Sequence, residues 1–283
     1  MNRLTKEQRI RVIAALVEGN SIRAIVRMTG VAKNTVSKLL QDIGIACAEL
    51  HDKTVRNLKT QHVQADEIWC FVGAKQKNIP PDKVNDGWGD AWTWTAIDAD
   101  SKLCVSYLVG GRDGQWAQRF MLDVAERVSG RIQITTDGHR FYVQAVANAF
   151  GHGLAADYAM LQKIYGPIRD DERRYSPPVC LGCEVKAIFG NPDPKHISTS
   201  YVERQNLTMR MHMRRFTRLT NAFSRKLTNL RCAVALHFAH YNFCRVHQTL
   251  RVTPAMEAGI ADHVWTLGEL TALLENEVVR RMA

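Results

Sequence analysis

The order of strand-like and helical segments after Val63 constrains the fold of this chain more than any other feature. Before Val63 the apolar residues recur at helical intervals, and from Val63 onward they alternate as in half-buried strands. The segments read as strand, strand, strand, helix, strand and helix, at 63–72, 92–98, 103–109, 113–128, 132–137 and 141–150. We therefore predict an α/β fold, with a mixed sheet flanked by helices.

This is the order of the ribonuclease-H-like fold, in which the first and fourth strands are parallel neighbours at the centre of the sheet. Asp66 lies in the first strand run, Asp137 ends the fourth, and Glu203 begins a long helical stretch. Three carboxylates placed in this way can hold a pair of Mg²⁺ ions about 3.5–4 Å apart, an arrangement that serves in-line phosphoryl displacement. Mg²⁺ prefers carboxylate and phosphate oxygens as ligands, so we expect no Cys or His cage.

Each acidic residue also has a simpler explanation. Glu203 with Ser200 fits a capping box at a helix start, and Asp137 followed by glycine fits a common turn. Asp66 can be an aspartate that binds backbone at a strand end. We favour the metal hypothesis because Asn206 and Arg210 share a helix face with Glu203, and because all three acids occur in the right order.

The sequence pattern of residues 1–45 predicts a small helical module that binds DNA. Three helices are expected, over about 5–18, 22–28 and 32–42, with Ser21 capping the second and Gly30 in the turn that follows. A helix-turn-helix of this kind places its last helix in the major groove. The side chains expected to face DNA are Lys33, Asn34, Thr35, Ser37 and Lys38. A purely structural helical bundle is the alternative, and 46–61 is interpreted as a connecting helix or linker.

Charge distribution supports a polyanionic partner. The formal net charge is +10, and between Glu203 and Arg251 the only acid is Glu203 itself. The basic residues of this stretch are Arg204, Arg210, Arg214, Arg215, Arg218, Arg225, Lys226, Arg231, Arg245 and Arg251. Seven scattered cysteines argue against a disulfide framework, and no secretion signal or membrane-length apolar run is found, so we expect a reducing cytoplasm.

Two segments fall outside the predicted core pattern. The stretch 151–199 is proline-rich, reads as an insertion, and shows one short strand near 185–190. Its Cys180 and Cys183 leave a structural zinc open, with His152 and His196 as the available further ligands, although the spacing requires none. Residues 262–283 predict an amphipathic helix through Leu267, Leu270, Leu274 and Val278, which we expect to dock on the catalytic domain of its own chain in preference to a second subunit.

Four motifs carry a resemblance to a known family: Asp66-Glu67-Ile68-Trp69, Thr136-Asp137-Gly138, residues 199–206, and residues 241–251 with Thr253-Pro254-Ala255. Together they resemble the DDE transposases, the superfamily that includes retroviral integrases, and more closely the insertion-sequence-one family of bacterial transposases. The resemblance covers about 61–260, which gives a catalytic domain over 62–260. Members of this family often carry an N-terminal zinc finger, whereas this chain has no cysteine before Cys47.

The resemblance implies a transposase that cuts and rejoins double-stranded DNA at the ends of its own mobile element, in bacterial cytoplasm at the nucleoid. Asp66, Asp137 and Glu203 would hold two Mg²⁺ ions, for which Mn²⁺ can substitute, and Arg210 would belong to the active site. Further DNA contacts are expected at Arg204, Asn206, Arg214, Arg215, Arg218 and His247. Synapsis of two ends implies a homodimer or higher oligomer. A non-catalytic helix-turn-helix repressor, and a metal-dependent nuclease that stops at hydrolysis, stay open as alternatives.

Overall fold

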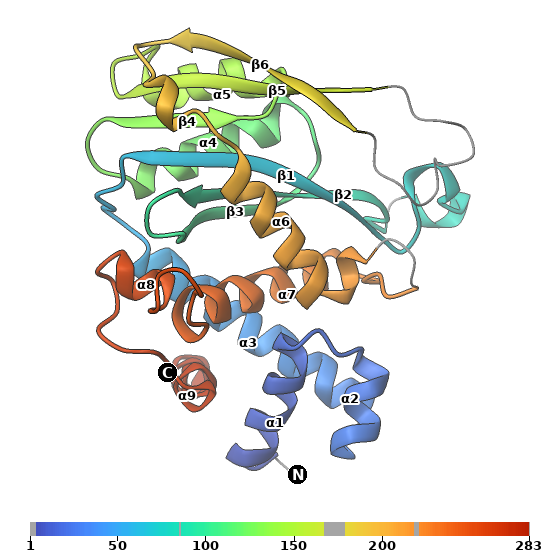
Figure 1. Ribbon diagram of the computed structural model, residues 1–283. Coiled ribbons are helices and arrows are strands. Elements are labelled where there is room, and N and C mark those ends of the chain that lie inside the picture. The colour runs from blue at the N-terminus through green and yellow to red at the C-terminus, as the bar shows by residue number, and fades with distance from the viewer. Residues whose placement is uncertain (1–3, 85, 167–178, 218–220, 283) are drawn as a thin grey trace.

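A six-stranded mixed sheet forms the centre of the protein, which we describe from a computed structural model (Figure 1). The structure describes residues 4–84, 86–166, 179–217 and 221–282, with 276–282 described by their backbone only. The strands are β1 (His62–Val72), β2 (Gly89–Asp98), β3 (Cys104–Gly110), β4 (Ile132–Thr136), β5 (Ala156–Tyr165) and β6 (Cys180–Phe189).

The strand order is β3-β2-β1-β4-β5-β6. β1 pairs antiparallel with β2 and parallel with β4, β4 pairs parallel with β5, and β2–β3 and β5–β6 are antiparallel. The ribonuclease-H-like arrangement has an antiparallel half, here β3-β2-β1, followed by parallel strands at the centre, here β1-β4-β5. The fold class predicted from the order of segments is therefore confirmed.

Helices cover both faces of this sheet. One face carries α4 (Gly114–Arg127) and α5 (Phe141–Phe150), whereas α6 (Ser200–His212) crosses β1 on the other face, with α7 (Leu227–Ala239) beneath it (Figure 1). Because strand side chains alternate, Val63 and Ala65 join the apolar core under α4 and α5, while Ile68 and Cys70 join the core shared with α6 and α7. Residues 66 and 67 therefore point to opposite faces of the sheet.

The N-terminal module consists of α1 (Lys6–Val17), α2 (Ile22–Thr29) and α3 (Lys33–Thr54). The Ser21 hydroxyl accepts a hydrogen bond from a backbone N–H of α2, and Gly30 takes the left-handed conformation at its end (φ 70°), as predicted. The third helix does not stop near residue 42, however, but continues to Thr54 and packs along α7. Gly44 makes this approach fit, since an added Cβ would lie 2.4 Å from the Cβ of Cys232. The module thus shares one apolar core with α6 and α7.

The strand β5 was missed by the sequence analysis, and β6 is longer than the short strand predicted near 185–190. Only the first half of β5 is buried, and the outer part of the β5–β6 hairpin is exposed on both faces. An exposed hairpin has no need of apolar alternation, so the pattern that identifies the other strands is absent. Both strands lie in the segment that was interpreted as an insertion.

The C-terminal helix α9 (Leu267–Met282) forms within the predicted segment and packs on its own chain, but on α1 and α3 of the N-terminal module instead of the catalytic domain that was expected. Leu270 and Leu274 are buried in the core of the N-terminal module, and the side chain of Val278 is outside the described residues. The remaining helical turns are Gln76–Asn78, Pro81–Lys83, Pro194–His196, Arg214–Phe216, the π-helical turn His240–Cys244 and α8 (Pro254–Glu257). Within the described residues, no helix combines the length and apolarity needed to cross a bilayer.

Candidate functional site

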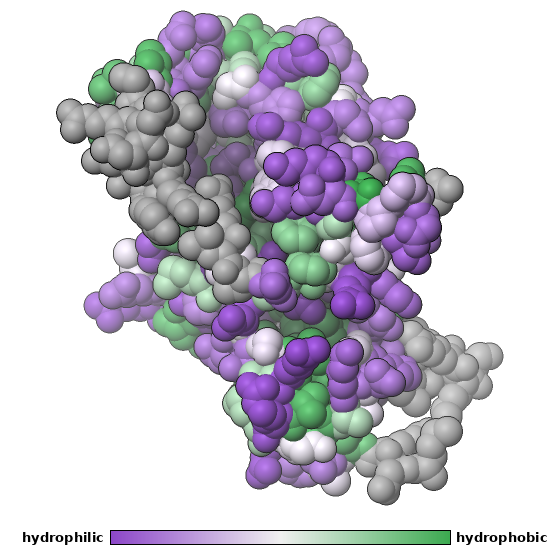
Figure 2. Space-filling view, turned by 90° about the vertical axis from the view of Figure 1, so that its right-hand side faces the viewer, coloured by the Kyte–Doolittle hydropathy of each residue, from purple (hydrophilic) through white to green (hydrophobic). Residues whose placement is uncertain are grey.

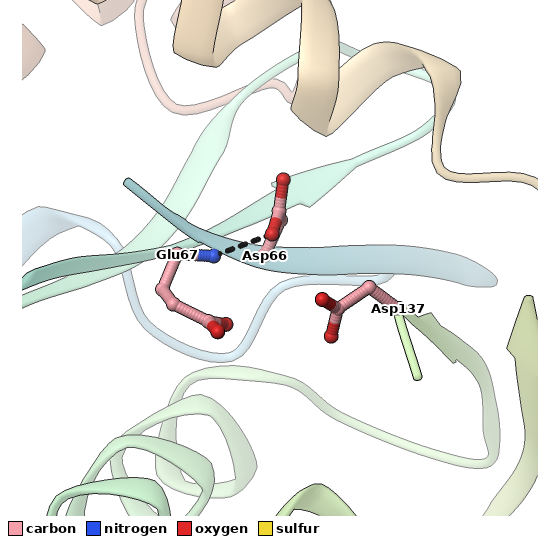
Figure 3. A group of neighbouring side chains, drawn as sticks. All are labelled: Asp66, Glu67 and Asp137. Atoms are coloured by element: carbon pink, nitrogen blue, oxygen red, sulfur yellow. Dashed lines mark hydrogen bonds between the residues drawn. The ribbon is translucent and has the colours of Figure 1, made fainter. Parts of the chain in front are cut away.

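Asp66 and Asp137 are brought together by the register of the two central strands. Ala65 of β1 pairs with Thr136 of β4, and the two aspartates occupy the next position in each strand. Glu67 joins them, and one carboxylate oxygen from each of the three residues lies within 4.8 Å of the others. In Figure 3, Asp66 and Glu67 leave β1 on opposite sides, and the Asp137 carboxylate points toward the strand. We call Asp66, Glu67, Asp137 and the nearby Glu203 the acidic centre.

Asp66 is held from two directions. Its Oδ1 accepts a hydrogen bond from the backbone N–H of Glu67 (2.7 Å), and its Oδ2 accepts one from the Nδ2 of Asn206 on α6 (2.8 Å). Gln64, two residues earlier on the same face, accepts hydrogen bonds from two backbone N–H groups at the start of α6 (2.8 and 3.2 Å). The central strand therefore positions the helix that carries Glu203.

The sequence prediction includes Glu67 in the Asp66 motif but gives it no role, yet it is the most deeply buried acid of the group, with its side chain 1% exposed. Its Oε1 accepts a hydrogen bond from the Nε of Arg112 (2.7 Å) and forms an ion pair with the Nη2 of the same guanidinium (2.6 Å), and its Oε2 accepts a hydrogen bond from the Tyr142 hydroxyl (3.0 Å). The Nε2 of His139 lies 3.8 Å from Oε1 and has no hydrogen-bond partner of its own. Strand alternation places Glu67 opposite Asp66, but the sequence gives no sign that Arg112 would reach it.

Glu203 lies beside the close cluster of Asp66, Glu67 and Asp137 and is not one of its three members. The Thr199 hydroxyl donates to its Oε1 (2.7 Å), and Lys163 of β5 forms an ion pair with its Oε2. Thr199 is the residue before the helix, and its side chain makes no capping hydrogen bond. The capping box considered for Ser200 and Glu203 is therefore not formed. Lys163 was missed because β5 was missed.

Burial and neighbouring negative charge raise the pKa of three carboxyls, those of Asp66, Glu67 and Asp137. Burial raises the pKa of Asp66 to about 8, with further contributions from the charges of Asp137, Glu67 and Glu203. Burial also raises the pKa of Asp137 and of Glu67. The amide nitrogen of Asn206 donates to Asp66, and its Oδ1 is buried with no hydrogen-bond partner among the described residues. Clustered carboxylates beside an unpaired oxygen acceptor are a donor set that fits a hard divalent cation.

The predicted DNA contacts differ in how accessible they are. The exposed ones are Lys33, Asn34, Thr35, Lys38, Arg204 and Arg214. Ser37, Arg210, Arg215 and His247 are partly buried, and Arg218 lies outside the described residues. Asn206 is buried on Asp66, and Lys38 pairs with Asp42 one turn along α3 (2.7 Å). The structure therefore groups Asn206 with the acidic centre and leaves the start of α3 open to solvent.

A basic cleft of about 890 Å³ lies between the N-terminal module and the end of α6. Its described lining contains no Asp or Glu, and its basic members are Arg23, Lys33, Arg214, Arg215, Arg225, His212 and His237. Burial lowers the pKa of the Arg215 guanidinium to about 10, and its Nε donates to the Ser224 hydroxyl (2.8 Å). The molecular face in Figure 2 is mostly hydrophilic, with smaller apolar areas between. A cleft lined by basic side chains, with no Asp or Glu in its described lining, favours the binding of a polyanion.

Cys180 and Cys183 are exposed on β6 as free thiols. Among the residues that the structure describes, no third Cys, His, Asp or Glu joins them as a metal ligand. His152 lies against Phe189 at the far end of β6 (6.2 Å between ring centres), and His196 stacks on another histidine (3.9 Å). The four-ligand zinc site that the spacing left open is not formed by these residues.

Comparisons with known proteins give structural similarities but no sequence match: no protein-family model matches the chain, and no curated protein is similar to it. A piggyBac transposase synaptic complex with hairpin DNA is similar over 99% of this chain and 73% of that one, with 10% identity and a TM-score of 0.43. A Mos1 transposase paired-end complex with the left transposon end is similar over 56% and 60%, with 12% identity and a TM-score of 0.25. A Mos1 mariner paired-end complex with Mn is similar over 56% and 59%, with 10% identity and a TM-score of 0.23. The fold assignment rests on the sheet order and not on these similarities.

Proposed function

We propose that the protein is a DDE transposase, which binds the ends of its mobile element and cuts and rejoins DNA in a metal-dependent reaction. The observation that carries this proposal is the register that sets Asp66 beside Asp137 at the centre of a ribonuclease-H-like sheet, under a helix that carries Glu203. Two basic hollows border α6, and neither has an Asp or Glu in its described lining.

Each residue of the acidic centre has a distinct role in this proposal. Asp66, Asp137 and Glu203 would hold Mg²⁺ or Mn²⁺, which activates a water or a DNA 3′-hydroxyl and stabilises the leaving oxygen. Asn206 orients Asp66 through its amide hydrogen bond. Lys163 balances the charge of the Glu203 carboxylate through their ion pair.

Glu67 we assign to support rather than to metal binding. A carboxylate has about four lone-pair positions. Arg112 and Tyr142 already supply two hydrogen bonds and one ion-pair contact to Glu67. Its negative charge is thereby matched, whereas Asp66 and Asp137 have no basic side chain bonded to them among the described residues.

Recognition of the DNA ends we assign to the N-terminal module, with the start of α3 in the major groove. Within transposases, the insertion-sequence-one family is the proposed relative, on the strength of the four motifs. Bacterial DNA at the nucleoid would be the substrate, and synapsis of two ends would require a dimer or larger assembly.

The test uses the full chain, DNA taken from both sides of its gene, and a target plasmid. With Mg²⁺ we expect cleavage at the ends and joining to the plasmid, both abolished by EDTA. Asp66→Asn, Asp137→Asn and Glu203→Gln should each lower the rate by at least the roughly 10–100-fold typical of lost metal-supporting groups, while DNA binding persists. Asp262→Asn, the same change at an exposed carboxylate, serves as the control.

The outcomes separate the competing functions. Cleavage without joining would identify a nuclease, and binding without cleavage would identify a repressor. A carboxylate variant that cleaves at the wild-type rate would remove that residue from the proposed metal site.

A further inference from the structure

The helix α6 has two polar flanks, and only one of them belongs to the acidic centre. Glu203 and Asn206 lie on the flank that meets Asp66, while Tyr201, Arg204 and Thr208 follow one another at the same helical spacing on the opposite flank. Val202 and Met209, between the two flanks, are buried against the sheet. The exposed ridge of the helix carries Leu207 and Met211, which are 43% and 63% exposed.

The second flank borders a hollow of about 350 Å³, which we call the flank hollow. Four basic residues line it: Lys102, Arg204, Arg245 and His247. No Asp or Glu occurs in its described lining. Arg204 comes directly after the proposed metal ligand in sequence, so the hollow and the acidic centre are separated by the width of one helix.

The basic groups of the flank hollow are held in place by the fold. Lys102 has a left-handed backbone (φ 61°), its carbonyl accepts a hydrogen bond from the Tyr241 hydroxyl (3.0 Å), and its ammonium lies 3.6 Å from the centre of the Tyr201 ring. The Nδ1 of His247 is hydrogen-bonded to the Thr249 hydroxyl (3.0 Å), which fixes the imidazole. The left-handed backbone of Lys102 costs free energy, because it is not a glycine, and such a conformation persists only where its surroundings hold it.

The positive charge of the flank hollow is not matched by the protein. Among the described residues, no carboxylate forms an ion pair with Lys102, Arg204 or Arg245. The Arg245 guanidinium bonds instead to the imidazole of His212 (2.5 Å). The pKa of His247 is lowered by burial and then by the three neighbouring cations. A bound anion would offset the mutual repulsion of Lys102, Arg204 and Arg245.

We propose that the flank hollow binds a backbone phosphate of the DNA strand that is not cut, so that the two strands of the duplex straddle α6. This inference rests on the proposed function. An α-helix with its side chains is about 10–12 Å across, close to the roughly 12 Å width of the major groove. The reacting strand would then lie over the acidic centre, the other strand over the hollow, and the apolar ridge of Leu207 and Met211 would face the base edges, where thymine methyl groups offer apolar contacts.

The test compares duplex with single-stranded DNA in EDTA, using a fluorescent 20-bp duplex and a 20-nt oligo-dT with the full chain. The double variant Arg204→Gln/His247→Gln should weaken duplex binding several-fold and lower the slope of log K against log salt by about 1 for each phosphate interaction that is removed. Binding of oligo-dT should change less than twofold. Arg204→Lys with native His247 should keep the wild-type slope, and Lys59→Gln, at an exposed lysine outside the hollow, is the matched control.

Two outcomes would overturn the proposal. Equal losses for duplex and oligo-dT would show that the hollow binds a strand irrespective of its partner, and unchanged binding of both would show that it is no DNA site. Thermal unfolding of each variant establishes that the fold is intact. Cleavage of the DNA that flanks the gene by the wild type in Mg²⁺, run in parallel, tests the proposed function separately. Cleavage without a duplex-selective loss refutes the straddled helix alone, and absence of cleavage refutes the proposed function.

Discussion

The acidic centre and the N-terminal module are stabilised in contrasting ways. At the acidic centre, carboxylates lie among hydrogen-bond donors, and burial together with neighbouring charge raises the pKa of Asp66, Glu67 and Asp137. In the N-terminal module, an apolar core is buried, while the polar side chains at the start of α3 are exposed. Burying carboxylates lowers stability and leaves a donor set that fits a cation, whereas burying an apolar core adds stability and leaves the polar side chains of the module exposed.

The largest effect we expect comes from removing the Asp66 charge in metal-free protein. The folded protein keeps the Asp66 proton to a pKa of about 8, whereas an unfolded aspartate loses it near 3.9. Between these values the folded state binds more protons, so the free energy of unfolding falls as pH rises. Asp66→Asn should largely lose this slope and exceed the wild type in stability at pH 8, by up to ~5 kcal/mol for about four units at ~1.36 kcal/mol each.

Chemical denaturation in EDTA at pH 5 and pH 8 measures this difference. Addition of Mn²⁺ at pH 8 should stabilise the wild type more than the variant, because the binding of a ligand to the folded state alone adds to stability. Identical pH slopes in the two proteins would show that the Asp66 proton is not coupled to folding, and the contrast between the two regions would fail.

The second largest effect belongs to the apolar side of the comparison. Leu270 of α9 is fully buried against α1 and α3. Leu270→Ala should cost about 2–4 kcal/mol, from lost burial and the cavity left behind, with no dependence on pH. Leu273→Ala, at a partly buried position on the same helix, should cost clearly less. Urea denaturation measures both losses.

Light scattering on the same variants tests how α9 is shared between copies. Because α9 docks in cis, the mass should not change in Leu270→Ala. A fall from dimer to monomer would place the helix at a subunit interface instead.

The third effect returns to the acidic centre. Arg112→Leu leaves the buried Glu67 carboxylate without its cation and should destabilise the protein by ~2–3 kcal/mol, below the ~3–5 kcal/mol of a fully buried pair, because the Arg112 side chain is 38% exposed. Adding Glu67→Gln should recover part of the loss. A double-mutant cycle by chemical denaturation measures the coupling, and additive losses would mean that the two side chains do not depend on each other.

The sequence was sufficient for the parts of the fold that obey periodicity. The alternation of apolar residues predicted β1 and β4, and their expected pairing placed Asp66 beside Asp137. The helical spacing of apolar residues predicted α4, α5 and α9. It was insufficient where exposure removes the pattern, as in β5, and therefore missed Lys163 beside Glu203. The end of α3 was misplaced because the residues after 42 pack on α7, a contact between distant parts of the chain.

The acidic centre shows the same limit at the scale of single side chains. Residue type and order were enough to select Asp66, Asp137 and Glu203. The support given to Glu67 by Arg112 and Tyr142 depends on three segments that meet only in the folded sheet. Contacts between segments far apart in the chain cannot be predicted from a local sequence pattern.

The smallest effect concerns the exposed surface of the N-terminal module. Asn34 is exposed in the first turn of α3, and an asparagine there can make two hydrogen bonds to an adenine edge. Asn34→Ala should weaken binding of the DNA that flanks the gene by about 1–2 kcal/mol and leave nonspecific duplex binding and thermal stability unchanged. Lys38→Gln removes a phosphate-binding ammonium or the Asp42 ion pair. It should weaken both DNAs equally and lower the salt slope by about 1. Competition binding at two salt concentrations separates these patterns. If Asn34→Ala weakens both DNAs equally, then α3 contacts the backbone only, and sequence recognition lies elsewhere on the molecule.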